Sequence, residues 1–115
     1  MAYTMLTKSK VTRSSGNIFA DIGLPNADEH ELKARIVIGL ARLIASKKLS
    51  QTEAARRIGI AQPDLSKVLR GNFAGFSLER LLGALRALGS DIEIKVKANK
   101  NADTDREGRF HLVMT

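Results

Sequence analysis

The sequence predicts a mainly α fold, a bundle of about five short helices followed by a short β element. Leucine recurs at helical spacing over residues 78–88, at positions i, i+3, i+4, i+7 and i+10. Helix start and stop signals recur over residues 49–71. Apolar and charged residues alternate over 92–97, which indicates a strand. With 115 residues, 43% of them apolar, the chain can form one domain with a packed core.

The N-terminal segment, residues 1–25, is expected to contain a basic arm and an apolar strap. Residues 1–17 are rich in loop signals and are expected to be irregular. Residues 17–24 are apolar and are expected to pack on the domain as a turn of helix or an extended strap. The basic residues of the arm are Lys8, Lys10 and Arg13.

Residues 26–90 are expected to form the main helical domain, beginning with a long helix from about residue 27 to residue 47. Asn26 is the expected N-cap, and the acidic residues of the first turns favour the positive end of the helix dipole. Apolar residues three and four apart predict one buried stripe along this helix. They are Leu32, Ile36, Leu40, Leu43 and Ile44.

Two short helices joined by a tight turn are predicted within residues 49–71. Ser50 and Glu53 match the S-x-x-E pattern of a capping box, which starts a helix. Gly59 ends that helix, because glycine adopts positive φ without a Cβ penalty. Helices this short must pack on other helices to be stable. The pair therefore predicts a helix-turn-helix, a unit whose second helix, here residues 60–70, enters the DNA major groove.

The C-terminal part is predicted to change from helix to strand. Ser77 is expected to cap the leucine-rich helix, and Gly89 to end it. Residues 92–97 would form one strand and residues 109–115 a second, with a polar turn between them. A lone hairpin is marginally stable. Residues 91–115 are therefore expected to serve as the dimerisation element, covered by the same element of a second subunit.

The spacing of key residues in the helical pair resembles the DNA-binding element of the lambda-repressor-like, XRE family of regulators. That pattern has Gln first, a small residue four later, Gly eight later, and apolar residues fourteen and seventeen later. A small residue lets the second helix cross at close range, Gly makes the turn, and the apolar residues hold the second helix on the core. The matching residues are Gln51, Ala55, Gly59, Leu65 and Val68.

The resemblance extends over residues 16–96 to small XRE regulators that are grouped with HigA-type antitoxins. It is carried by residues 17–23, 33–34, 76–82, 87–89 and 91–94. It implies a homodimeric repressor that binds double-stranded DNA at a palindromic operator. Stand-alone repressors share these residues, so an alternative stays open: an antitoxin that neutralises a small RelE/HigB-like toxin and represses its own operon.

Candidate DNA contacts divide into base readout and phosphate contact. Gln62 is the leading base reader, because a glutamine amide pairs bidentately with adenine. Pro63 offers only apolar contact, and Asp64 is expected either to cap the helix or to accept from cytosine. The family resemblance implies a phosphate contact at Gln51. The base-readout candidates are Gln62, Pro63, Ser66 and Lys67, and the phosphate candidates are Ser50, Gln51, Lys67, Arg70 and Asn72.

The charge distribution favours a polyanionic partner over catalysis. The formal charge is +7, and residues 47–71 carry six basic against two acidic residues, a net +4. The alternative is a basic surface that serves solubility. The chain has no cysteine, and its histidines, His30 and His111, lie far apart. No enzyme activity, cofactor, metal or membrane segment is therefore expected, and the expected location is the cytoplasm, at the bacterial nucleoid through DNA binding.

Overall fold

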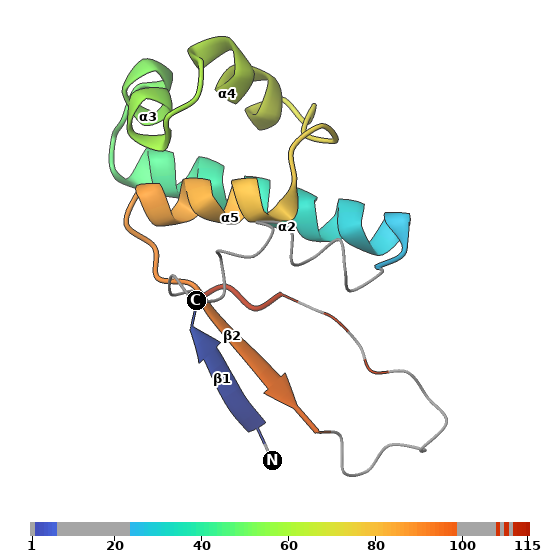
Figure 1. Ribbon diagram of the computed structural model, residues 1–115. Helices are drawn as coiled ribbons and strands as arrows, with labels where there is room; N and C mark the ends of the chain where they lie inside the picture. The colour runs from blue at the N-terminus through green and yellow to red at the C-terminus, as the bar shows by residue number, and fades with distance from the viewer. Residues whose placement is uncertain (1, 7–23, 99–107, 109, 111) are drawn as a thin grey trace.

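The computed structural model describes residues 2–6, 24–98, 108, 110 and 112–115. The elements are β1 (Ala2–Leu6), α2 (Asn26–Ser46), α3 (Gln51–Ile58), α4 (Gln62–Leu69), α5 (Leu78–Ala87) and β2 (Glu93–Lys97). Figure 1 shows α3 and α4 on one side of α2 and α5, and the two strands on the other side. The predicted mainly α fold is confirmed. The described residues contain four helices, against about five expected.

The core is built from the apolar faces of α2 and α5, which pack against each other. The predicted stripe of α2 is buried, except that Leu43 is only partly buried. On α5 the leucines at the predicted helical spacing face the same core, with Leu82 partly buried at its margin. The helical periodicity of the sequence therefore predicted the main packing interface. The fully or nearly buried members are Leu32, Ile36, Leu40, Ile44, Leu78, Leu81, Leu85 and Leu88.

The short helices α3 and α4 lie on this base and contact each other. Ala54 and Ala55 are the buried residues of α3, and their small side chains permit close approach of α4. Leu65 and Val68 are the buried residues of α4. Gly59 has a φ of 89° and ends α3 in the left-handed conformation. These burial positions and the positive φ at the turn are those that a helix-turn-helix arrangement requires.

A buried lysine joins the α4–α5 loop to α2, a feature that the sequence did not predict. Lys33 is only 6% exposed. Its Nζ lies 3.0 Å from the Glu29 carboxylate, one turn earlier on α2, and donates to the Ala74 carbonyl at 3.2 Å. In the same region the ring of His30 stacks on the buried ring of Phe73, with 4.9 Å between centroids. These contacts hold the loop that leads from α4 into α5.

The helix caps agree with the sequence in part. The Oγ of Ser50 accepts from the Glu53 N–H at 3.0 Å, and the Oγ of Ser77 accepts from the Arg80 N–H at 3.1 Å, as predicted. The expected cap at Asn26 is wrong, because α2 already includes this residue. Pro25 holds the N-cap position, without a side-chain hydrogen bond. Proline has the right φ to precede a helix and supplies no cap acceptor.

The strand pairing differs from the prediction. β1 pairs with β2 antiparallel, and Tyr3 lies opposite Val96. Residues 2–6 are thus a strand, although residues 1–17 were expected to be irregular. The predicted second strand over 109–115 is not observed, since residues 108, 110 and 112–115 lie in no strand. β2 is paired by a segment about ninety residues earlier, and local composition carries no signal for such a distant partner.

Two predictions for the N-terminal segment fall outside the described part of the chain. These are the basic residues of the arm, Lys8, Lys10 and Arg13, and the apolar strap up to residue 23. Leu24 is described and packs against the core, partly buried, just before α2 begins.

Gly59→Ala should destabilise the protein, whereas Gly83→Ala should stabilise it. A Cβ has open space at both positions, so the backbone conformation decides the effect. The φ of Gly59 is positive, and an L-residue there costs about 1–2 kcal/mol. Gly83 lies inside α5, where alanine is better than glycine by about 0.5–1 kcal/mol. Urea denaturation of both variants measures the change. Equal effects of the two substitutions would contradict this assignment.

Candidate nucleic-acid interface

The N-termini of α3 and α4 meet on the surface through two glutamines. The Nε2 of Gln62, the first residue of α4, donates to the Oε1 of Gln51, the first residue of α3, at 3.1 Å. Both residues are exposed. They are eleven residues apart, so the turn at Gly59 brings them together. A predicted base reader and a predicted phosphate contact are thus directly hydrogen-bonded, which sequence spacing did not indicate.

The remaining base-readout candidates share the outer face of α4. Pro63 and Lys67 are exposed and Ser66 is partly exposed, whereas Leu65 and Val68 face the core. Pro63 lies in the first turn, where its missing N–H costs no helical hydrogen bond. Because α4 is buried on one side only, its opposite side can enter a groove.

The expected cap at Asp64 is not observed. The N-cap position of α4 is Ala61, and no side chain makes a cap hydrogen bond there. Asp64 lies in the first turn of the helix, partly buried, where its charge interacts favourably with the helix dipole.

The phosphate candidates lie at both ends of α4. Ser50 and Gln51 are next to its start, because Gln51 is bonded to Gln62. Arg70 is the C-cap, and the backbone N–H of Asn72 donates to the Lys67 carbonyl at 2.9 Å. All of these phosphate candidates are exposed. An eight-residue helix is roughly 12 Å long, so the candidates flank it as the two backbone strands flank a groove.

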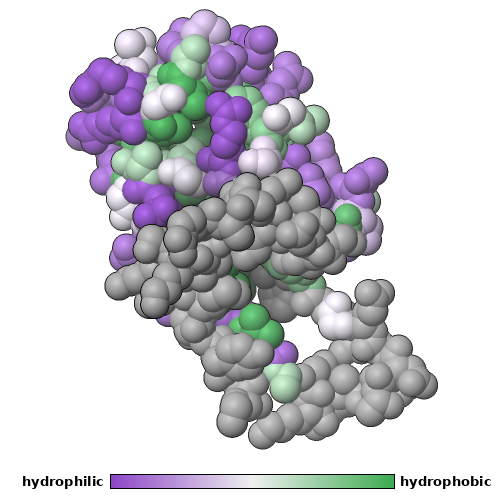
Figure 2. All heavy atoms as spheres, in the orientation of Figure 1, coloured by the Kyte–Doolittle hydropathy of each residue, from purple (hydrophilic) through white to green (hydrophobic). Residues whose placement is uncertain are grey.

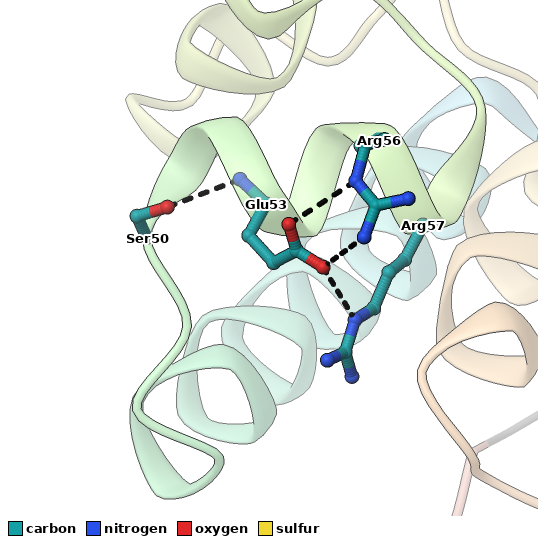
Figure 3. A network of polar contacts seen from close by, with 4 residues as sticks. All are labelled: Ser50, Glu53, Arg56 and Arg57. Carbon is teal, nitrogen blue, oxygen red and sulfur yellow. Dashed lines mark hydrogen bonds and ion pairs between the residues drawn. The ribbon is translucent and has the colours of Figure 1, made fainter.

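An ion-pair network on the outer face of α3 was not predicted. The carboxylate of Glu53 accepts from Arg57 Nε at 3.1 Å and from both Nε and Nη2 of Arg56 (Figure 3). The hydrogen bonds from Arg56 and then Arg57 lower the pKa of Glu53, and Glu53 raises the pKa of Arg56. The carboxylate of Glu53 is charged at pH values above this lowered pKa, so the network persists there. The network is lost as the pH falls through the pKa of Glu53. The sequence signal that could have predicted this network is a glutamate that precedes two arginines by three and four residues.

This network changes how the basic cluster is distributed. The cluster residues are all exposed, and Figure 2 shows hydrophilic side chains over the α3–α4 end of the molecule. Glu53 offsets part of the positive charge that Arg56 and Arg57 place on α3. The positive charge at α4 therefore comes mainly from that helix's own Lys67 and from Arg70 at its end. The six cluster residues are Lys47, Lys48, Arg56, Arg57, Lys67 and Arg70.

Two further findings on the described residues concern metal binding and membrane spans. These residues contain no group of three or more His, Cys, Asp or Glu side chains that could hold a metal ion. None of their helices combines the length and apolar character needed to cross a membrane.

Comparison with known proteins identifies the class. A family model described as a helix-turn-helix domain matches residues 18–97. A solved structure whose name assigns it to the XRE family of transcriptional regulators is 35% identical, with a TM-score of 0.71. The match covers 79% of this chain and 100% of that one. No curated protein matches the sequence. The chain belongs to the helix-turn-helix family of XRE-type transcriptional regulators and is a DNA-binding protein, of a family that is typically non-enzymatic.

Proposed function

We propose that this protein is a sequence-specific repressor that binds a palindromic operator as a homodimer, with α4 in the major groove. The observation that carries this proposal is the exposed hydrogen bond between Gln62 and Gln51. A glutamine at the start of a recognition helix needs a fixed orientation before it can discriminate bases. Here a neighbouring side chain supplies that orientation, without occupying the groups that DNA requires. The bacterial cytoplasm is the proposed location.

The direction of the bond fits DNA recognition. Gln51 uses its Oε1 to accept from Gln62, which leaves its NH₂ group to donate to a phosphate oxygen. Gln62 uses one N–H towards Gln51 and keeps one N–H and its Oε1. An adenine presents N7 as acceptor and N6–H₂ as donor in the major groove. Gln62 can therefore pair bidentately with adenine while it remains bonded to Gln51.

The other candidate residues on and beside α4 divide between base contact and phosphate contact. Ser66 lies one turn after Gln62 and is short enough for close approach to a base edge, and Pro63 can contact a thymine methyl group. Lys67 and Arg70 can reach phosphates or bases from the same helix, and Ser50 and Asn72 flank it. Phosphate contacts fix the position of the protein, and base contacts give it specificity.

Homodimerisation is proposed because α4 is short. A helix of eight residues contacts only a few base pairs, which is too little sequence for a unique operator. Two copies related by a two-fold axis contact two inverted half-sites, and their contributions combine. Occupation of an operator by such a dimer would block access to the promoter, which is the proposed mode of repression.

Gln62→Ala should lower the affinity for the operator by about 1–3 kcal/mol and relax the preference at one base pair of each half-site. Affinity for random DNA should change little, because phosphate contacts are kept. Operators selected from a randomised duplex library, followed by fluorescence anisotropy, measure both quantities. Equal losses on operator and random DNA would show that Gln62 does not contact a base.

Gln51→Ala should weaken binding to every duplex and also reduce specificity. The general loss follows from the missing phosphate contact, and the loss of specificity from the unsupported Gln62. A double-mutant cycle with Gln62→Ala tests the link on the same two duplexes. The two losses in operator affinity should be non-additive, because the residues are in direct contact. Additive losses would show that the two glutamines contribute to operator affinity independently of each other.

An antitoxin function is the alternative that the HigA-type resemblance supports. The strands lie on the opposite side of α2 and α5 from α3 and α4 (Figure 1), so a protein partner could bind there while DNA stays bound. Co-expression with a small neighbouring gene product and purification through a tag on one chain tests this. A stable complex in which the partner loses its ribonuclease activity supports the antitoxin function, and separate elution of the two proteins opposes it.

A further inference from the structure

Strand β2 has an edge that no described strand covers. Within the described residues, the sheet contains only β1 and β2, so β2 is paired along one edge. Among the described residues no strand pairs with the N–H and C=O groups of the other edge, where a further strand could add. The five residues of β1 include no charged type, whereas β2 contains Glu93, Lys95 and Lys97. The pairing with β1 therefore gives the charges of β2 no oppositely charged partner across the strands.

The residues around β2 would pair favourably with a second copy of the same segment that runs in the opposite direction. Residues 91–97 are Asp-Ile-Glu-Ile-Lys-Val-Lys, with both acids before both bases and apolar residues between them. In an antiparallel pair of two copies centred on Ile94, Asp91 lies opposite the second copy's Lys97 and Glu93 opposite its Lys95. On the other face Ile92 lies opposite the second copy's Val96. Every charged residue then faces an opposite charge, and every apolar residue faces an apolar one.

Neighbouring registers lack this match. In a register centred on Lys95, this lysine would lie opposite Lys95 of the second copy. In a register centred on Glu93, the two Glu93 carboxylates would lie opposite each other. A centre between Ile94 and Lys95 would place charged residues opposite apolar ones. Like charges directly opposite destabilise a strand pair, and a register with mixed faces cannot keep one face apolar. The charge pattern therefore selects a single register.

The structure leaves these side chains accessible. The side chains of Glu93 and Lys95 are 52% and 63% exposed, and the 3.7 Å contact between them on one face of β2 is a weak surface pair. Val96 is 43% exposed, which is high for a large apolar residue in a strand. Glu93, Lys95 and Val96 are thus able to make contacts outside the chain, whereas Ile92 and Ile94 are partly buried and Ile92 packs against the core.

We propose that β2 pairs antiparallel with β2 of a second copy of this chain, in the register centred on Ile94. This would extend the sheet in the order β1-β2-β2-β1. The proposal rests on the proposed homodimer and names its interface. α4 lies on the opposite side of α2 and α5 from the strands (Figure 1), so the contact leaves α4 uncovered in both copies.

Charge exchange between Asp91 and Lys97 tests the register. These residues are six apart, roughly 20 Å in an extended chain, so they cannot pair within one copy. Asp91→Lys and Lys97→Asp should each weaken the dimer about three- to thirty-fold, because each creates two like-charge contacts across the symmetric pair. The double variant Asp91→Lys/Lys97→Asp should return to within about three-fold of the original dissociation constant. Analytical ultracentrifugation over a concentration series measures this constant.

A matched control exchanges an acidic and a basic residue that lie on the helices, away from the strands. Asp28→Lys/Arg86→Asp alters two exposed residues and keeps the net charge, and it should leave the dissociation constant unchanged. Circular dichroism checks that each variant is folded. A dimer that is insensitive to the single exchanges, or not restored by the double one, overturns this interface but leaves the homodimer intact. A chain that stays monomeric overturns both, whereas DNA recognition through Gln62 is judged separately from the operator binding of Gln62→Ala.

Discussion

The burial of the apolar stripe of α2 against α5 is the interaction on which the rest of the structure depends. α3 and α4 have only eight residues each, too few for a stable isolated helix. Their stability must come from tertiary packing on the base formed by α2 and α5. Burying one leucine or isoleucine contributes roughly 1.5–3 kcal/mol, and the stripe supplies four such residues. The candidate DNA-binding surface on α3 and α4 is therefore supported by residues that face away from it.

Small residues convert this packing into a defined site. Ala54 and Ala55 let α4 approach α3 closely, and Gly59 reverses the chain between them. These two features set the position of the first residue of α4 relative to the first residue of α3. The hydrogen bond between Gln62 and Gln51 is the result at the surface. The geometry proposed for DNA recognition thus depends on the small volume of two buried alanines and on the left-handed conformation of Gly59.

Charged side chains divide between structural and surface roles. Lys33 is buried and satisfied by the Glu29 carboxylate and the Ala74 carbonyl, so its charge fixes a loop and is hidden from DNA. Glu53 holds Arg56 and Arg57 on the outer face of α3. Lys67 and Arg70 remain exposed on the candidate recognition helix. A formal charge of +7 therefore overstates the charge that α4 presents, and the arrangement of the charges matters more than their sum.

The sequence by itself determined the helices, their caps at Ser50 and Ser77, the turn at Gly59 and the buried stripe. These features depend on residues within a few positions of one another, and helical periodicity records them directly. Only the tertiary structure decided that β2 pairs with residues 2–6, that Lys33 reaches Ala74, and that Gln62 meets Gln51. These contacts join residues that lie in different elements, from eleven to about ninety positions apart, and partner choice there depends on the whole packed arrangement, which no local pattern encodes.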